Sequence, residues 1–142
     1  MKIENALVLA ATLKGSPYRK GESVMAHPVM WFEVLGKDGG KLQQFYGGLF
    51  GWTFDVIQPI NYGVAKTGNG RGIMGGIGQT FQGTRPWVTF YVETPDVTAS
   101  LEKATALGGR VVTPRTVMPD VTLGVFEDPE GHVIGLVEAK PS

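Results

Sequence analysis

Apolar and polar residues alternate with the two-residue period of β-strands in two similar segments, 27–34 (HPVMWFEV) and 87–92 (WVTFYV). In each segment one face is wholly apolar, and the other mixes apolar, aromatic and polar side chains. The apolar faces comprise Met30, Phe32 and Val34 in the first segment and Val88, Phe90 and Val92 in the second. The mixed faces comprise Val29, Trp31 and Glu33, and Trp87, Thr89 and Tyr91. We expect both segments to be strands with one face on the core.

Two segments have the spacing of amphipathic helices instead. The first covers residues 41–50 and places apolar side chains at Leu42, Phe45, Tyr46 and Leu49. The second covers residues 97–107 and places them at Val97, Leu101, Ala104 and Leu107. Glycines follow each segment, at Gly51 and at Gly108-Gly109, and can end the helices.

The remaining strands are short and are separated by glycine-containing turns. Single strands are expected at 52–57 and 110–113, and hairpins at 62–77 and 122–138. In the second hairpin the turn reads Asp-Pro-Glu-Gly, where Pro129 suits the second position and Gly131 the left-handed one. Asp128 is expected to close this turn by accepting hydrogen bonds from backbone N–H groups.

The same order of elements occurs twice. A shift of 58 residues lays Phe32-Glu33-Val34 on Phe90-Tyr91-Val92, and the hairpins align with Gly75 opposite Gly135. The sequence therefore predicts an α+β fold made of two tandem β-α-β-β-β modules, about 26–78 and 85–139, within one domain covering 25–142. Residues 1–24 form an N-terminal extension, which is either an arm that packs on a neighbour or an additional strand.

Composition excludes several classes of function. The 142 residues have a formal net charge of zero and no cysteine, which argues against nucleic-acid binding, disulfides and thiolate chemistry. No apolar run approaches the length of a membrane span, so no membrane partner is expected, and the cytoplasm is the expected location.

Two motifs resemble one superfamily. The sequence KLQQFYGGLFGW after the first strand and FEDPEGHVIGLVE at the C-terminus are similar to the vicinal oxygen chelate superfamily, which includes glyoxalase I, bleomycin-resistance proteins and extradiol dioxygenases. The resemblance covers about residues 26–138. It implies that the modules form a curved mixed sheet with a central cup whose concave face holds a ligand, and that the chain forms a homodimer.

The alternation then assigns residues to the cup. We expect the apolar faces to pack under the helices and the mixed faces to line the cup. The expected ligand-binding residues are Val29, Trp31, Glu33, Trp87, Thr89 and Tyr91. Aromatic rings with a few polar groups suit an amphipathic small molecule. The alternative is that these side chains fill a closed interior or a dimer interface.

The resemblance also implies where metal ligands would lie. The corresponding positions are Val29, Trp87, Gly75 and Gly135, and none has a side chain that coordinates a metal. We therefore expect neither metal nor other cofactor, with His27 and Glu138 as the alternative ligands if a metal binds.

Glu33 is the candidate catalytic residue. If it points into an apolar cup, burial would raise its pKa and make it a usable general base. The preferred interpretation from the sequence is that Glu33 lies at an exposed strand end or pairs with Lys or Arg. The sequence leaves three functions open: a metal-independent small-molecule binder, a lyase, isomerase or dioxygenase that uses a metal or Glu33, and a structural protein with a filled cup.

Overall fold

The computed structural model describes residues 26–68, 70–80, 85–119 and 121–140, so the expected N-terminal extension lies outside the described residues. The first half of the chain contains β1 (Val29–Gly36), α2 (Gly39–Phe50), β2 (Thr53–Ile57), β3 (Tyr62–Lys66) and β4 (Gly75–Gln79). The second half contains β5 (Trp87–Thr94), α3 (Val97–Ala106), β6 (Arg110–Val117), β7 (Thr122–Glu127) and β8 (Val133–Glu138). The predicted order of elements is confirmed.

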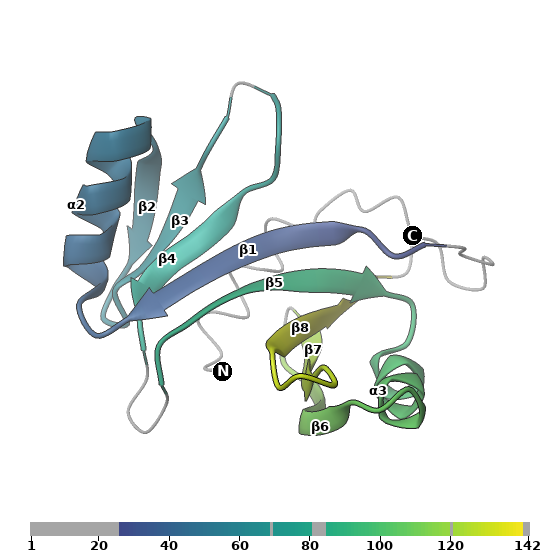
Figure 1. Ribbon diagram of the computed structural model, residues 1–142. Helices are drawn as coiled ribbons and strands as arrows, with labels where there is room; N and C mark the ends of the chain where they lie inside the picture. Colours follow the sequence, from purple (N-terminus) through teal and green to yellow (C-terminus); the bar gives the residue numbers. More distant parts are fainter. Residues whose placement is uncertain (1–25, 69, 81–84, 120, 141–142) are drawn as a thin grey trace.

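All the strands join one mixed sheet in the order β2-β3-β4-β1-β5-β8-β7-β6 (Figure 1). Each module supplies four neighbouring strands, and the modules meet where β1 and β5 pair antiparallel. The last strand of each module returns beside its first strand in parallel, β4 beside β1 and β8 beside β5. The sheet is open, with β2 and β6 at its edges, and the α+β class and the two-module architecture are confirmed.

The repeat corresponds to an internal twofold axis at the centre of the sheet. Phe32 of β1 lies directly opposite Phe90 of β5. These residues are separated by the same 58 positions that superimpose the two halves of the sequence. Equivalent residues therefore lie at equal distances on either side of this pair.

Local signals fix the ends of both helices. Asp38 caps α2 by accepting from the Lys41 backbone N–H at 3.0 Å, and Asp96 caps α3 through Ala99 at 3.0 Å. Gly51 ends α2 in the left-handed conformation with φ 72°, as the sequence predicts.

Both helices pack on the same face of the sheet, which we call the outer face. The side chain of Gln43 on α2 donates to the carbonyl of Ile77 at 2.9 Å. On α3, Val97 and Leu101 pack with Leu136 of β8. The opposite face carries Glu33 and is called the inner face.

The helices leave much of the apolar outer face uncovered, which contradicts the expectation that they cover it. Helix α2 packs mainly over β4 and helix α3 mainly over β6 and β7, so neither lies over the β5 strand at the centre of the sheet (Figure 1). As a result, Val88 is 78% exposed and Phe90 is 40% exposed. The helix α2 likewise turns Phe45 and Leu49 outward and buries Gln43, because the Gln43 amide finds backbone carbonyls over β4.

The second hairpin has the predicted turn. One carboxylate oxygen of Asp128 accepts from the backbone N–H groups of Glu130 and His132, each at 2.9 Å. Gly131 has φ 90°, the left-handed conformation that the turn requires. Among the described helices, none has the length and apolar character of a membrane span.

Candidate functional site

The inner face brings Glu33 together with three hydrogen-bond donors. The Tyr62 hydroxyl donates to Oε2 of Glu33 at 2.8 Å. The Trp87 indole N–H and the Tyr91 hydroxyl donate to Oε1 at 2.8 Å and 3.1 Å. Trp31 extends the network, because its indole N–H donates to the Tyr62 hydroxyl at 3.0 Å. We call these five residues the Glu33 cluster.

Glu33 has no solvent exposure. Burial raises the pKa of its carboxyl above the ordinary value of 4.5, and the hydrogen bonds from Tyr62, Trp87 and Tyr91 offset part of that rise. Among the described residues, no lysine or arginine forms an ion pair with it. The preferred interpretation from the sequence, an exposed or salt-bridged Glu33, is therefore wrong, because the strand directs this side chain between aromatic rings.

Both tyrosines of the cluster remain hydrogen-bond donors. Burial, followed by the charge of Glu33, raises the pKa values of Tyr62 and Tyr91 well above the ordinary value of 10.0. Neither hydroxyl therefore ionises near neutral pH. Three protonated donors facing one carboxylate favour its ionised form locally and oppose the effect of burial.

Sequence reasoning missed Tyr62. It begins β3, and only the pairing of β3 with β4, and of β4 with β1, brings it to Glu33. The available signal was its place as the first residue of a hairpin strand that the repeat pairs with the last strand of the same module. That signal predicts the strand, but it does not predict that the Tyr62 ring extends across β4 to Glu33 on β1.

Two glycines make room for the tyrosine rings. A Cβ atom at Gly76 would collide with the Tyr62 side chain, and one at Gly135 would collide with the Tyr91 ring. Gly76 lies beside Glu33 in β4, as Gly135 lies beside Tyr91 in β8. The alignment of Gly75 with Gly135 is therefore off by one residue: Gly75 pairs with Phe32 and underlies that ring.

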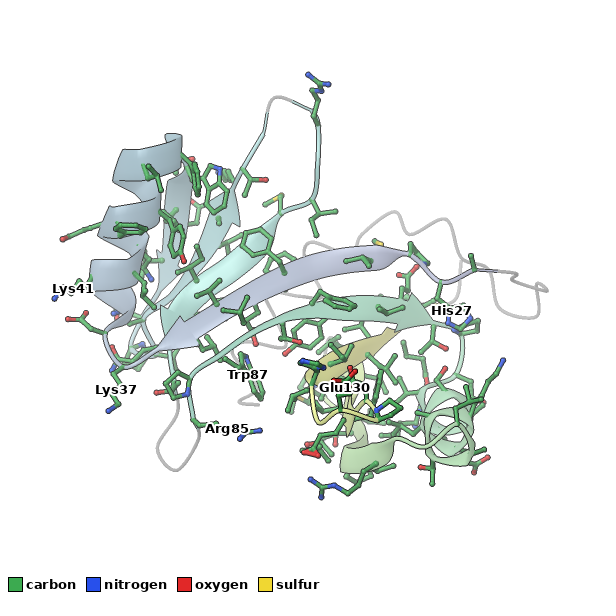
Figure 2. The ribbon with its side chains drawn as sticks, in the orientation of Figure 1. His27, Lys37, Lys41, Arg85, Trp87 and Glu130 are labelled. Atoms are coloured by element: carbon green, nitrogen blue, oxygen red, sulfur yellow. The ribbon has the colours of Figure 1, made fainter. Side chains whose placement is uncertain are left out.

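Other expected site residues lie elsewhere. Val29 is 44% exposed, at the irregular start of the β1–β5 pairing. Thr89 is buried, and its hydroxyl donates to the Val133 carbonyl at 2.6 Å. His27 lies near the start of β1, at the opposite end of the central strand pair from Trp87 (Figure 2). Glu138 forms a two-bond pair with Arg115 at 2.7 and 2.8 Å, and also accepts from the backbone of Val97.

The positions that the resemblance assigns to metal ligands do not fit a metal. Trp87 instead donates to Glu33, and the space above Gly135 is filled by the Tyr91 ring. Within the described part of the chain, no group of three or more His, Cys, Asp or Glu side chains could hold a metal ion. Two of the four positions, Trp87 and Gly135, thus contribute to the Glu33 cluster: Trp87 donates a hydrogen bond, and Gly135 leaves room for the Tyr91 ring.

Apolar side chains surround the cluster. The buried members of this core are Trp31, Leu35, Tyr62, Tyr91, Val121, Leu123 and Val137. Partly buried residues packed against them include Ile60, Met74 and Met118. A carboxylate in such surroundings can anchor a donor group of a ligand or accept a proton.

A model of the glyoxalase-like domain matches residues 32–137. The chain is 29% identical to the anthracycline biosynthesis protein DnrV of Streptomyces peucetius over 71% of this chain, and it spans only 43% of that relative. Methylmalonyl-CoA epimerase of Mycobacterium tuberculosis has a similar fold, with a TM-score of 0.59 and 15% identity over 85% of this chain and 95% of that one. A glyoxalase/bleomycin resistance protein/dioxygenase superfamily member of Vibrio splendidus also has a similar fold. Its TM-score is 0.56, and it is 12% identical over 80% of this chain and 99% of that one.

Proposed function

The chain belongs to the glyoxalase-like domain family of the vicinal oxygen chelate superfamily, and we propose that it binds a small aromatic or amphipathic molecule on its inner face. The observation that carries this proposal is the Glu33 cluster. A buried carboxylate is costly to a fold unless its interactions compensate, and such groups concentrate at functional sites. In this chain it lies among aromatic rings, on the face of the sheet that the family resemblance implies would hold a ligand.

The cluster suits a ligand that donates a hydrogen bond. Oε1 of Glu33 already accepts two hydrogen bonds, whereas Oε2 accepts one, from Tyr62. Oε2 therefore retains acceptor capacity for a hydroxyl or ammonium group. Trp31 and Tyr91 supply flat apolar surface next to it.

The name of the relative DnrV suggests which ring systems to test. Anthracyclines combine a planar polycyclic body with hydroxyl and ammonium donors, the two properties that would suit an aromatic cluster around a carboxylate. We propose that a polycyclic aromatic compound of this general kind is the ligand.

Binding requires the inner face to open, since Glu33 and Trp31 are 0% exposed. Met74 and Met118 pack against the core while remaining partly exposed. Methionine side chains are flexible and repack at low cost, so these residues are suited to giving way as a ligand enters.

The test is a calorimetric titration of the protein with daunorubicin, together with tryptophan emission. We expect saturable binding with a changed emission, because two of the three tryptophans belong to the cluster. Glu33→Gln should weaken binding by about tenfold to a hundredfold, the usual effect of losing a hydrogen bond to a charged group.

The matched control is Glu102→Gln, which changes an exposed carboxyl on α3. It should bind as the wild type does. Absence of binding to daunorubicin and to a panel of polycyclic phenols and amines would contradict the proposal, as would equal binding by the wild type and Glu33→Gln.

The raised pKa of Glu33 favours an enzyme as the second candidate. Here Glu33 would remove a proton from a bound substrate, in a lyase or isomerase reaction without a metal. Chromatography coupled to mass spectrometry, applied to compounds incubated with the protein, would reveal conversion, because it separates isomers of equal mass as well as products of changed mass. Glu33→Gln should then abolish product formation while daunorubicin-like compounds still compete for the site.

A further inference from the structure

A cavity lies on the outer face of the second module, on the opposite side of the sheet from the Glu33 cluster. It lies beside the C-terminal half of α3, and we call it the α3 cavity (Figure 1). Its volume is about 430 Å³, within the range of about 300–1,000 Å³ that is usual for small-molecule sites. Its apolar lining comprises Ala104 and Leu107 from the helical side and Val92, Phe126 and Leu136 from the sheet.

The sequence of α3 leaves this space open. Val97, Leu101 and Ala104 form the stripe that helical spacing turns toward the sheet. Val97 and Leu101 fill their places and are 0% and 4% exposed. Ala104 comes next and supplies only a methyl group. Leu107, which the same spacing would add to the stripe, follows the end of α3 at Ala106 and is 71% exposed. The last turn of α3 therefore stands beside an apolar floor without filling the space above it.

The lining suits a flexible aliphatic chain. Val92, Leu107 and Leu136 contribute branched aliphatic side chains, and among the described residues around the cavity Phe126 is the one apolar aromatic. The Glu33 cluster differs, because it surrounds its carboxylate with aromatic rings. The two faces of the sheet thus offer surfaces of different shape.

The charges at the rim of the cavity favour an anion. Lys103 borders it, and none of the ion pairs within the described ranges includes this lysine. Two carboxylates also border the cavity, but both are engaged. Glu127 accepts two hydrogen bonds from Arg110 at 2.6 and 2.7 Å, and Asp128 pairs with His132 and closes the β7–β8 turn. Lys103 is therefore the charge that a ligand can match.

The backbone at the end of α3 does not offset this charge. The carbonyl groups of residues 103–105 accept hydrogen bonds from the backbone N–H groups of residues 107–109. The carbonyl groups that would otherwise favour a cation at a helix C-terminus are therefore already occupied.

We propose that the α3 cavity binds a medium-chain aliphatic monocarboxylate, with its chain on Phe126 and Leu136 and its carboxylate on Lys103. One lysine balances one negative charge. A carboxylate therefore suits it better than a phosphate monoester, whose charge near neutral pH is about −1.5 to −2. This site is independent of the Glu33 cluster and selects the opposite kind of ligand, flexible and anionic instead of planar and hydrogen-bond donating.

Calorimetric titration with decanoate, below its critical micelle concentration, tests the proposal. We expect saturable binding at one site per chain. Octanoate, which is shorter by two methylene groups, should bind about tenfold more weakly. Decyltrimethylammonium has the same chain and a cationic head, and it should bind at least tenfold more weakly than decanoate. Equal binding of the two decyl compounds would contradict the role of Lys103.

Filling the cavity supplies the first variant. Ala104→Leu should abolish decanoate binding, and its thermal unfolding midpoint should not fall, because the cavity has room for the larger side chain. Ala106→Leu is the matched control, since Ala106 is exposed on the same helix. Retention of decanoate binding by Ala104→Leu would overturn the proposal.

Removing the charge supplies the second variant. Lys103→Met keeps the aliphatic stem and should weaken decanoate binding by about fivefold. Lys41→Met, which changes an exposed lysine on α2, should bind as the wild type does. Lys103→Met should also bind daunorubicin as the wild type does, because the two sites lie on opposite faces.

Competition separates this site from the inner face. An excess of daunorubicin should leave decanoate bound. Displacement by daunorubicin would assign decanoate to the Glu33 cluster and overturn the proposal, as would the absence of saturable decanoate binding.

Discussion

The Tyr91 hydroxyl donates to the Glu33 carboxylate at 3.1 Å, although the two residues occupy equivalent positions in the two modules, 58 residues apart. The internal twofold axis between Phe32 and Phe90 brings these equivalent positions close together on the inner face. One position carries an acceptor and the other a donor. The two modules therefore differ at this pair, and the difference produces a polar contact across the axis.

Glu33 should make the free energy of unfolding depend on pH. Its pKa is higher in the folded chain than the ordinary 4.5, so the folded state holds the proton more tightly. Stability should therefore fall as pH rises from about 4.5 through the raised pKa, and stay level above it. Urea unfolding between pH 4 and 9 measures this. Glu33→Gln should lack that decline, and a decline of equal size in the variant would assign it to other groups.

Loss of the Tyr62 hydroxyl should destabilise the fold. Tyr62→Phe removes one donor to a buried carboxylate and leaves the Trp31 N–H without its acceptor. We expect a loss of about 1–3 kcal/mol in the free energy of unfolding and a further rise in the pKa of Glu33. Tyr46→Phe is the matched control, because among the described contacts no hydrogen bond to the Tyr46 hydroxyl occurs. Equal stability of the two variants would contradict this account.

A methyl group at Gly135 should displace the Tyr91 ring. Gly135→Ala introduces a Cβ atom into the space that the ring occupies, and overpacking of this kind typically costs about 1–3 kcal/mol. The variant should also show altered Trp87 emission, because Trp87 shares Oε1 of Glu33 with Tyr91. Gly48→Ala, at an open position on α2, should instead stabilise the helix by up to about 1 kcal/mol.

Gln43 should anchor α2 to the sheet more strongly than the exposed Phe45 or Leu49. Its amide donates to the Ile77 carbonyl at 2.9 Å and is buried. Gln43→Ala should cost about 1–3 kcal/mol, whereas the exposed Gln44→Ala should change little. Thermal unfolding of the two variants and the wild type measures the effect. A Gln44→Ala loss as large as that of Gln43→Ala would disprove the anchor.

The sequence by itself determined the local elements, their order and their repetition. Alternation placed Trp31 and Glu33 on one face, and Gly51 marked the end of α2. These features depend on residues within a few positions of one another, so the periods of strand and helix are enough to find them.

Only the tertiary structure decided the surroundings of Glu33. Tyr62 reaches it across strands whose order no local pattern gives, and the ring fits because Gly76, not Gly75, lies beneath it. A one-residue offset in a strand reverses the face of every side chain, so register had to be known before these contacts could be. Burial likewise depends on which surfaces meet. For that reason Gln43 is buried while Phe45 remains exposed, against the preference of each residue taken alone.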